Sequence, residues 1–205
     1  MSDNIIYVSG VHGSGKSTLI KKLGSDSGHF FVSKKIQIPK PEHVRERQLV
    51  RVCRFYLQAF YEQEHARQCT NKYVLCDRGW QDMLAYAAGF AKLGWMPHEE
   101  YKTLRDITDF LFQDSGGKIV FLNPPREFIE ENLQKRWEKG RKKWREDDFD
   151  YLDMVYESYQ YLIPRLRCDY LEVKETDLQE RVNKIYEWLK IPLPCTVQEV
   201  HVDGE

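Results

Sequence analysis

Short apolar segments alternate along the chain with longer segments whose apolar residues recur every three or four positions. The short runs predict buried strands of a parallel sheet, because strands covered on both faces are apolar throughout rather than at every second residue. The five expected strands are residues 4–9, 30–32, 73–76, 118–122 and 170–173.

The longer segments predict helices between these strands. Their expected ranges are about 16–23, 42–69, 80–91, 98–112, a segment from about 126, a segment from 151 to Pro164, and a last helix to about 189. Thr176 and Gln179 have the spacing of a capping box at the start of that last helix. The alternation favours a three-layer α/β fold with a five-stranded parallel sheet flanked by helices, and with its ligand beyond the carboxyl ends of the strands.

The chain has 205 residues, which suits one sizeable core, so residues 1–205 are expected to form a single domain. Its proline-punctuated tail, residues 191–205, has no clear assignment. A formal net charge of −1 argues against a nucleic-acid partner, because such domains usually carry a basic excess. Five scattered cysteines indicate neither a disulfide framework nor a zinc site. With no signal peptide and no apolar stretch of membrane-spanning length, we expect a cytoplasmic protein without membrane contact.

The run from Gly10 to Ser17 satisfies every fixed position of the phosphate-binding pattern Gly-x-x-x-x-Gly-Lys-Ser. It lies between an expected strand and an expected helix, which is the context that this loop requires. Glycines let the backbone N–H groups converge on phosphate oxygens, Lys16 bridges the β- and γ-phosphates, and Ser17 contributes a hydroxyl to Mg²⁺. The expected nucleotide-binding residues are Gly10, His12, Gly13, Ser14, Gly15, Lys16, Ser17 and Thr18.

Asp77 and Arg78 follow the third expected strand directly. A carboxylate at that position can hold Mg²⁺ directly or through water, and the arginine can reach a phosphoryl group in transfer. The metal ligands are therefore expected to be Ser17 and Asp77. A structural ion pair or a helix cap by Asp77 is the alternative.

The segment of about 136–148 is the most highly charged part of the chain. If it is helical, Arg141 and Arg145 lie one turn apart on one face, from which two guanidinium groups can clamp phosphates. A solvated face is the alternative for such a run of charges.

Together these features resemble the thymidylate kinase and deoxynucleoside kinase superfamily of P-loop kinases. The resemblance rests on Gly10–Thr18, Val74–Arg78 with Leu84–Tyr86, Ile119–Leu122 with Pro124 and Pro125, and Arg136–Tyr159. It implies ATP and Mg²⁺ as cofactors, a sheet of order 2-3-1-4-5 and frequent homodimers. It also implies an arginine-rich lid in which Arg141 and Arg145, with Arg136, close over ATP, and an acceptor-side role for Arg78. The expected catalytic residues are thus Lys16, Asp77, Arg78, Arg141 and Arg145.

The acceptor is left open by a departure from the family pattern. Nucleoside kinases of this family usually carry a glutamate base just after the second strand, but residues 33–39 contain no carboxylate. Glu42 is the nearest alternative, and Asp77 could serve if Mg²⁺ is held elsewhere. A nucleoside monophosphate needs no such base, and Arg47, Arg51 and Arg54 have the spacing of a basic helix face that could hold its phosphate.

The sequence therefore leaves two functions open. The first is transfer of the γ-phosphoryl of ATP to a nucleoside monophosphate or a deoxynucleoside, so that the partner is a small-molecule acceptor. The second is a P-loop ATPase or regulatory nucleotide-binding module without an acceptor. A GTPase is disfavoured, because the base-recognition pattern Asn-Lys-x-Asp is absent from the sequence.

Overall fold

One parallel five-stranded sheet forms the centre of the protein in a computed structural model that describes residues 4–34, 48–68, 72–112, 117–142 and 145–193. The strands are β1 (Ile5–Ser9), β2 (Phe30–Val32), β3 (Tyr73–Asp77), β4 (Lys118–Leu122) and β5 (Asp169–Val173). Their order is β2-β3-β1-β4-β5, and every pairing is parallel. The expected strand order is confirmed.

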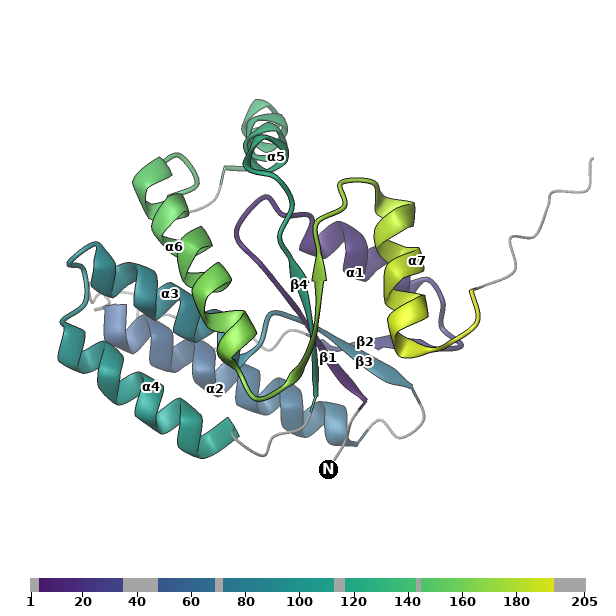
Figure 1. The fold of residues 1–205 in the computed structure, drawn as a ribbon, viewed down its shortest axis with the longest axis horizontal. Helices are drawn as coiled ribbons and strands as arrows, with labels where there is room; N and C mark the ends of the chain where they lie inside the picture. The colour runs from purple at the N-terminus through teal and green to yellow at the C-terminus, as the bar shows by residue number, and fades with distance from the viewer. Residues whose placement is uncertain (1–3, 35–47, 69–71, 113–116, 143–144, 194–205) are drawn as a thin grey trace, which may run out of the picture.

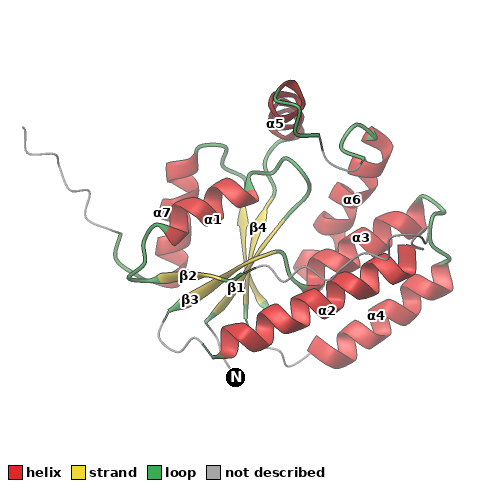
Figure 2. Cartoon of the chain, turned by 180° about the vertical axis from the view of Figure 1, so that it is seen from behind, coloured by secondary structure: helices red, strands yellow, loops and turns green. Residues whose placement is uncertain are grey.

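Helices cover both faces of the sheet (Figures 1 and 2). The α-helices are α1 (Lys16–Gly24), α2 (Gln48–Arg67), α3 (Trp80–Lys92), α4 (His98–Phe112), α5 (Arg126–Glu138), α6 (Phe149–Leu162) and α7 (Leu178–Leu189), with a 3-10 turn η1 (Ile163–Arg165) after α6. α1 and α7 lie on one side, α2, α3, α4 and α6 lie on the other, and α5 lies beyond the carboxyl end of β4. The expected three-layer arrangement is confirmed.

β1 explains why the sheet needs two helical layers. Ile5 and Tyr7 join the cluster under α3 and α6, whereas Ile6 and Val8 join the cluster under α1 and α7. Successive side chains of a strand point to opposite faces, so an entirely apolar strand is stable only when both faces are covered. All five residues of β1 are buried. The continuous apolar run therefore places β1 at the centre of the sheet.

The register brings the chemically important strand ends together. Val8 lies beside Asp77 on β3, and Ser9 lies beside Phe121 on β4. The chain leaves β1 at Gly10, so the phosphate-binding run begins at the edge of the sheet where Asp77 ends β3. Parallel topology thus gathers segments that are far apart in the sequence.

Two helix boundaries differ from expectation. The last helix is capped by Asp177, whose carboxylate accepts from the Glu180 N–H at 2.9 Å, so the capping box expected at Thr176 and Gln179 is wrong by one residue. A carboxylate at the N-cap is also favoured by the helix dipole. α2 is described from Gln48, and residues 42–47 of the expected helix lie outside the described residues.

Among the helices of the described ranges, none is long and apolar enough to cross a bilayer.

Candidate nucleotide-binding and phosphoryl-transfer site

The run Gly10–Ser17 forms a tight loop between β1 and α1. Gly10, Gly13 and Gly15 have φ values of 141°, 81° and 94°, a region that side-chain-bearing residues rarely adopt. A Cβ at Gly10 would lie 2.6 Å from the Leu122 carbonyl oxygen, and one at Gly13 would lie 2.8 Å from the Ile129 carbonyl oxygen. The glycines are therefore required by backbone conformation and by close packing against β4 and α5.

Lys16 is the first residue of α1 and is buried inside this loop. Its Nζ donates to the carbonyl oxygens of Gly10 at 2.8 Å and Val11 at 2.7 Å. Burial, helped by the charge of Arg78, lowers the pKa of Lys16 to about 7. An anionic phosphate would offer this ammonium a stronger partner than two neutral carbonyls, because it adds the attraction of opposite charges in a buried site.

Ser17 and Thr18 follow on the first turn of α1 and are exposed. Asp77 is half-buried at the end of the neighbouring strand, and its charge acts on Lys16. A hydroxyl and a carboxylate are the oxygen donors that Mg²⁺ prefers, with waters and phosphate oxygens completing the shell. The donor set at this edge of the sheet therefore fits Mg²⁺, with Ser17 and Asp77 as the residues that would hold it.

Arg78 has an unusual backbone conformation at this edge. Its φ is 77°, in the left-handed region that disfavours residues with a side chain. Its guanidinium lies 4.9 Å from the centre of the Tyr86 ring. Strained residues persist where their surroundings hold them, and they cluster at functional sites.

Asp82 stabilises the strained turn at Arg78, and it is not among the site residues expected from the sequence. This fully buried carboxylate accepts from the Gly79 N–H and Ser9 Oγ, both at 2.8 Å, and from the Tyr159 hydroxyl at 2.5 Å. Burial raises the pKa of Asp82, and the charge of Arg78 opposes that shift. One carboxylate thus ties the Arg78 turn to the end of β1 and to α6. The only sequence signal was its position three residues after Gly79, where an acid can bond back to the start of a helix.

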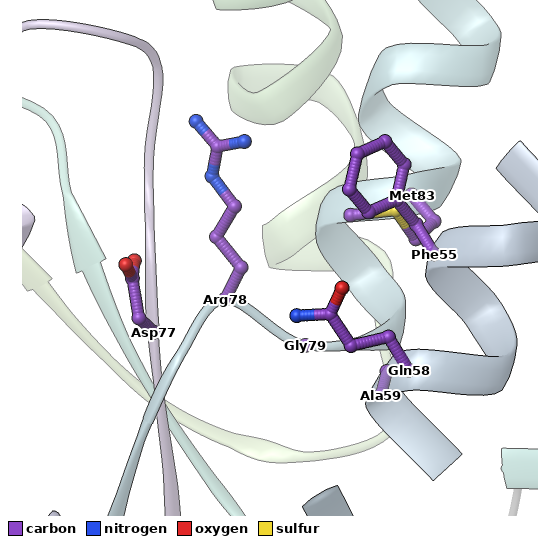
Figure 3. Close-up of a pocket in the computed structure, with 7 residues that line it drawn as sticks. All are labelled: Phe55, Gln58, Ala59, Asp77, Arg78, Gly79 and Met83. Atoms are coloured by element: carbon purple, nitrogen blue, oxygen red, sulfur yellow. The ribbon is translucent and has the colours of Figure 1, made fainter. Parts of the chain in front are cut away.

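A pocket opens beside Asp77 and Arg78 (Figure 3). Its space, open mouth included, is about 310 Å³. It is lined by Phe55, Gln58, Ala59, Asp77, Arg78, Gly79 and Met83. Figure 3 shows Phe55 lying over Met83 and the Gln58 amide facing the Arg78–Gly79 turn. An aromatic and thioether wall with one amide and one charged edge is the composition typical of a small-molecule site.

The arginine-rich segment differs from expectation. α5 ends at Glu138, and Gly140 follows with a φ of 64°, which is the conformation that commonly terminates a helix. Arg141 and Arg145 therefore lie in the loop between α5 and α6, and their expected pairing on one helical face is wrong. Arg141 is exposed. Arg145 stacks over the Trp95 ring at 4.0 Å and pairs with Asp148 at 2.7 Å.

The other expected site residues have definite partners. His12 Nδ1 lies 3.1 Å from a carboxyl oxygen of the buried Glu146, which also accepts from Arg136. Ser14 lies in the loop, and its carbonyl accepts from Arg181 of α7 at 2.9 Å. Arg181 is buried and also donates to the Glu175 carbonyl at 2.6 Å. No sequence pattern marked Arg181, and Glu146 stood out only as one of the acids at the end of the charged segment of about 136–148, which does not indicate burial.

The basic helix face expected from Arg47, Arg51 and Arg54 is only partly covered by the described residues. Arg47 lies outside the described residues, and the side chain of Arg51 is not described. The Arg54 guanidinium lies 5.1 Å from the centre of the Phe55 ring. Arg54, one cation of this face, therefore lies next to Phe55, which lines the pocket.

The fold resembles that of known nucleotide-binding enzymes. Three solved structures of deoxyadenosine kinase from M. mycoides each match 91% of this chain at 15% sequence identity. The one with bound dATP has a TM-score of 0.68 over 99% of its chain. Those with bound dCTP, and with dCMP and a flexible dCDP as products, have TM-scores of 0.58 and 0.61 over 98% of theirs. The resemblance to the P-loop kinase superfamily is thus confirmed at the level of the fold.

No curated protein matches the sequence significantly. A family described as AAA domain matches residues 5–181, a range that holds all five strands and the loop Gly10–Ser17. Since this range is well over half of the chain, the protein belongs to the AAA domain family.

Proposed function

We propose that this protein is an ATP-dependent phosphotransferase that transfers the γ-phosphoryl group to a deoxynucleoside or a nucleoside monophosphate. The observation that carries the proposal is the shared border of two sites. Asp77 and Arg78 line the pocket, and the charges of both act on Lys16 in the phosphate-binding loop. A bound acceptor would therefore lie next to the terminal phosphate of a bound donor, as in-line transfer requires.

The loop amides and Lys16 would hold the donor phosphates. Mg²⁺ on Ser17 and Asp77 would neutralise charge on the β- and γ-phosphates and fix their orientation. Arg78 would stabilise charge on the group in transfer, and the exposed Arg141 is available to approach it from the α5–α6 loop. Arg145 is a weaker candidate for that role than the sequence suggested, because it already stacks on Trp95 and pairs with Asp148.

The chemistry of the groups that line the pocket supports a nucleoside as acceptor. Gln58 carries both a donor and an acceptor, which can read the edge of a base, and Phe55 can stack on its face. If Mg²⁺ is held elsewhere, Asp77 at the rim would instead accept the proton of an attacking hydroxyl. The kinase of M. mycoides, with the same fold and nucleotides of adenine and cytosine bound, supports this class of acceptor.

A nucleoside monophosphate is the second candidate acceptor. It is favoured by Arg54, whose guanidinium lies against the Phe55 ring at the border of the pocket. A phosphate on the acceptor would need such a cation, whereas a hydroxyl would not.

The test is direct detection of phosphorylated product. The protein is incubated with ATP, Mg²⁺ and one acceptor from a panel of deoxynucleosides, ribonucleosides and nucleoside monophosphates, and the product is identified by mass spectrometry. We expect transfer to at least one member. ATP turnover that is the same without any acceptor would contradict the proposal and favour an ATPase or a regulatory module. We also infer a single-domain cytoplasmic enzyme, and sedimentation velocity would test the homodimer that the family resemblance implies.

A further inference from the structure

Glu146 joins three parts of the chain that are distant in the sequence. Its carboxyl group is fully buried, lies 3.1 Å from His12 Nδ1 of the phosphate-binding loop, and accepts from Arg136 on the last turn of α5. The residue itself lies in the loop that leads into α6. A charge is buried in this way only when it is paired and hydrogen-bonded, because the unpaired group would lose its hydration.

The backbone is held so that Glu146 points inward. Arg145 has a φ of 53°, a left-handed conformation that is costly for a residue with a side chain. Its guanidinium is held by Trp95 on one side and by Asp148, the N-cap of α6, on the other. These two contacts hold the strained turn in place immediately before Glu146.

His12 is a defined partner in this arrangement. Its ring lies edge-on to Tyr86 at 5.8 Å and near Tyr151 at 6.4 Å, and only 14% of the side chain is exposed. Burial lowers the pKa of His12 to about 4, so the ring is neutral near pH 7. A carboxylate only accepts hydrogen bonds, so the neutral ring donates to Glu146 from Nδ1.

Arg136 is the partner that lies near the phosphate-binding lysine. Its charge is among those that lower the pKa of Lys16, after burial and Arg78, so it lies within electrostatic reach of the phosphate-binding lysine. Neighbouring residues of α5 already pack on the loop, since the Asn132 side-chain amide donates to the Gly13 carbonyl at 2.9 Å. Glu146 thus connects one group inside the loop with one cation beside it.

We propose that Glu146 is a positioning residue that sets the phosphate-binding loop, through His12, and the guanidinium of Arg136 in one arrangement around the donor phosphates. The proposal rests on the proposed function, because the donor phosphates are those of ATP. It assigns His12 a role at a position of the motif that tolerates many residues. It also predicts that His12 and Glu146 act as a unit, so that the loss of either removes most of what both contribute.

Four variants test the proposal: Glu146→Gln, His12→Ala, the double variant, and His12→Asn. Asparagine places a donor near the position of Nδ1, so it should rescue what alanine removes. ATP affinity is measured by calorimetry without an acceptor, and kcat and both KM values are measured with the acceptor found in the product screen. Glu131→Gln on the exposed surface of α5 is the matched control, because Glu131 pairs with Lys135 away from the loop.

We expect Glu146→Gln and His12→Ala each to weaken ATP binding and to lower kcat by about 10- to 100-fold, the range for hydrogen bonds to charged groups. The acceptor KM should stay within about twofold, because no residue of the pocket is changed, and this split separates positioning from general loss of structure. The double variant should be no worse than the poorer single variant, and His12→Asn should approach the wild type.

Wild-type ATP affinity and kcat in His12→Ala, losses that multiply in the double variant, or an equal loss in the Glu131→Gln control would each overturn the proposal. If Glu146→Gln fails to fold, the comparison of His12→Ala with His12→Asn decides alone. Binding of ATP without transfer to any acceptor would remove the proposed function, while the calorimetric comparison would still decide the role of Glu146.

Discussion

The two halves of the site are built in different ways. The proposed donor half is largely one contiguous segment, Gly10–Thr18, whose backbone amides and Lys16 would supply most of the binding groups. The proposed acceptor pocket takes Phe55 and Gln58 from α2, the turn after β3, and Met83 from α3. A local motif can be detected in one sequence because the spacing of its residues along the chain determines how they lie in space. A pocket assembled by the fold has no comparable signature.

Because of this difference, substitutions in the two halves should have different effects on activity. Backbone conformation and one buried lysine determine the donor half, so substitutions there should remove activity with any acceptor. Side chains determine the pocket, so substitutions there should change which acceptor is used. Three substitutions test this division, and the stability of the protein in acid tests the environment of His12.

The largest expected effect is that of Lys16→Ala, which removes the one side-chain cation inside the loop. Transfer should fall on the order of 10³-fold with every acceptor, as for the loss of a preorganised charge-stabilising group. Steady-state kinetics measure the loss, with exposed Lys21→Ala as the matched control. Activity close to that of the wild type would show that the loop Gly10–Ser17 takes no part in the transfer.

The next effect is that of Asp77→Asn at the border between the halves. Removal of this carboxylate should lower kcat by roughly 100-fold and raise the Mg²⁺ concentration needed for half-maximal rate, because the amide is a weaker metal ligand. A Mg²⁺ titration at fixed ATP measures both. Asp106→Asn, on the exposed face of α4, is the control. An unchanged Mg²⁺ dependence would show that Asp77 does not hold the metal.

Gln58→Leu should affect the acceptor half alone. We expect the acceptor KM to rise about tenfold, since an uncharged polar contact in a buried pocket is lost, with ATP affinity unchanged. Kinetics with varied acceptor and calorimetry with ATP distinguish the two constants, and Gln68→Leu, exposed after α2, is the control. A weaker affinity for ATP in the variant would mean that the halves are not separable.

The smallest effect concerns stability in acid. The pKa of His12 is lowered from 6.5 to about 4 by burial, so the unfolded chain binds a proton that the folded chain does not bind in this range. The unfolding free energy should therefore decrease as the pH falls from about 6.5 to about 4, by at most about 1.4 kcal/mol per pH unit from this group. Urea unfolding across this range measures the slope. His12→Asn should reduce it, and an identical slope in the variant would contradict the assignment.

The fold was largely predictable because its signals are local. Continuous apolar runs predicted the strands, and the expected helix 98–112 and strand 118–122 agree with α4, which ends at Phe112, and β4, which starts at Lys118. The expected pairing of Arg141 and Arg145 on one helical face was wrong, because α5 ends at Glu138 and Gly140 follows it with a φ of 64°. A glycine at that position in the sequence is itself a signal for the end of a helix.

The supporting residues of the site could not be predicted in the same way. Asp82 receives bonds from Ser9 and Tyr159, and Glu146 receives them from His12 and Arg136. Acidic residues are seldom fully buried, and only tertiary packing buries these two. Their roles depend on contacts across more than 70 and 130 positions of the chain, which no local pattern encodes.

The central claim is that the loop and the pocket serve one reaction, and the measurement that tests it most directly follows ADP and phosphorylated acceptor in the same sample. The account predicts that the two products form in equal amounts, that both require acceptor, and that both disappear in Lys16→Ala. ADP formation at the same rate with and without acceptor, or with no phosphorylated product, would contradict it.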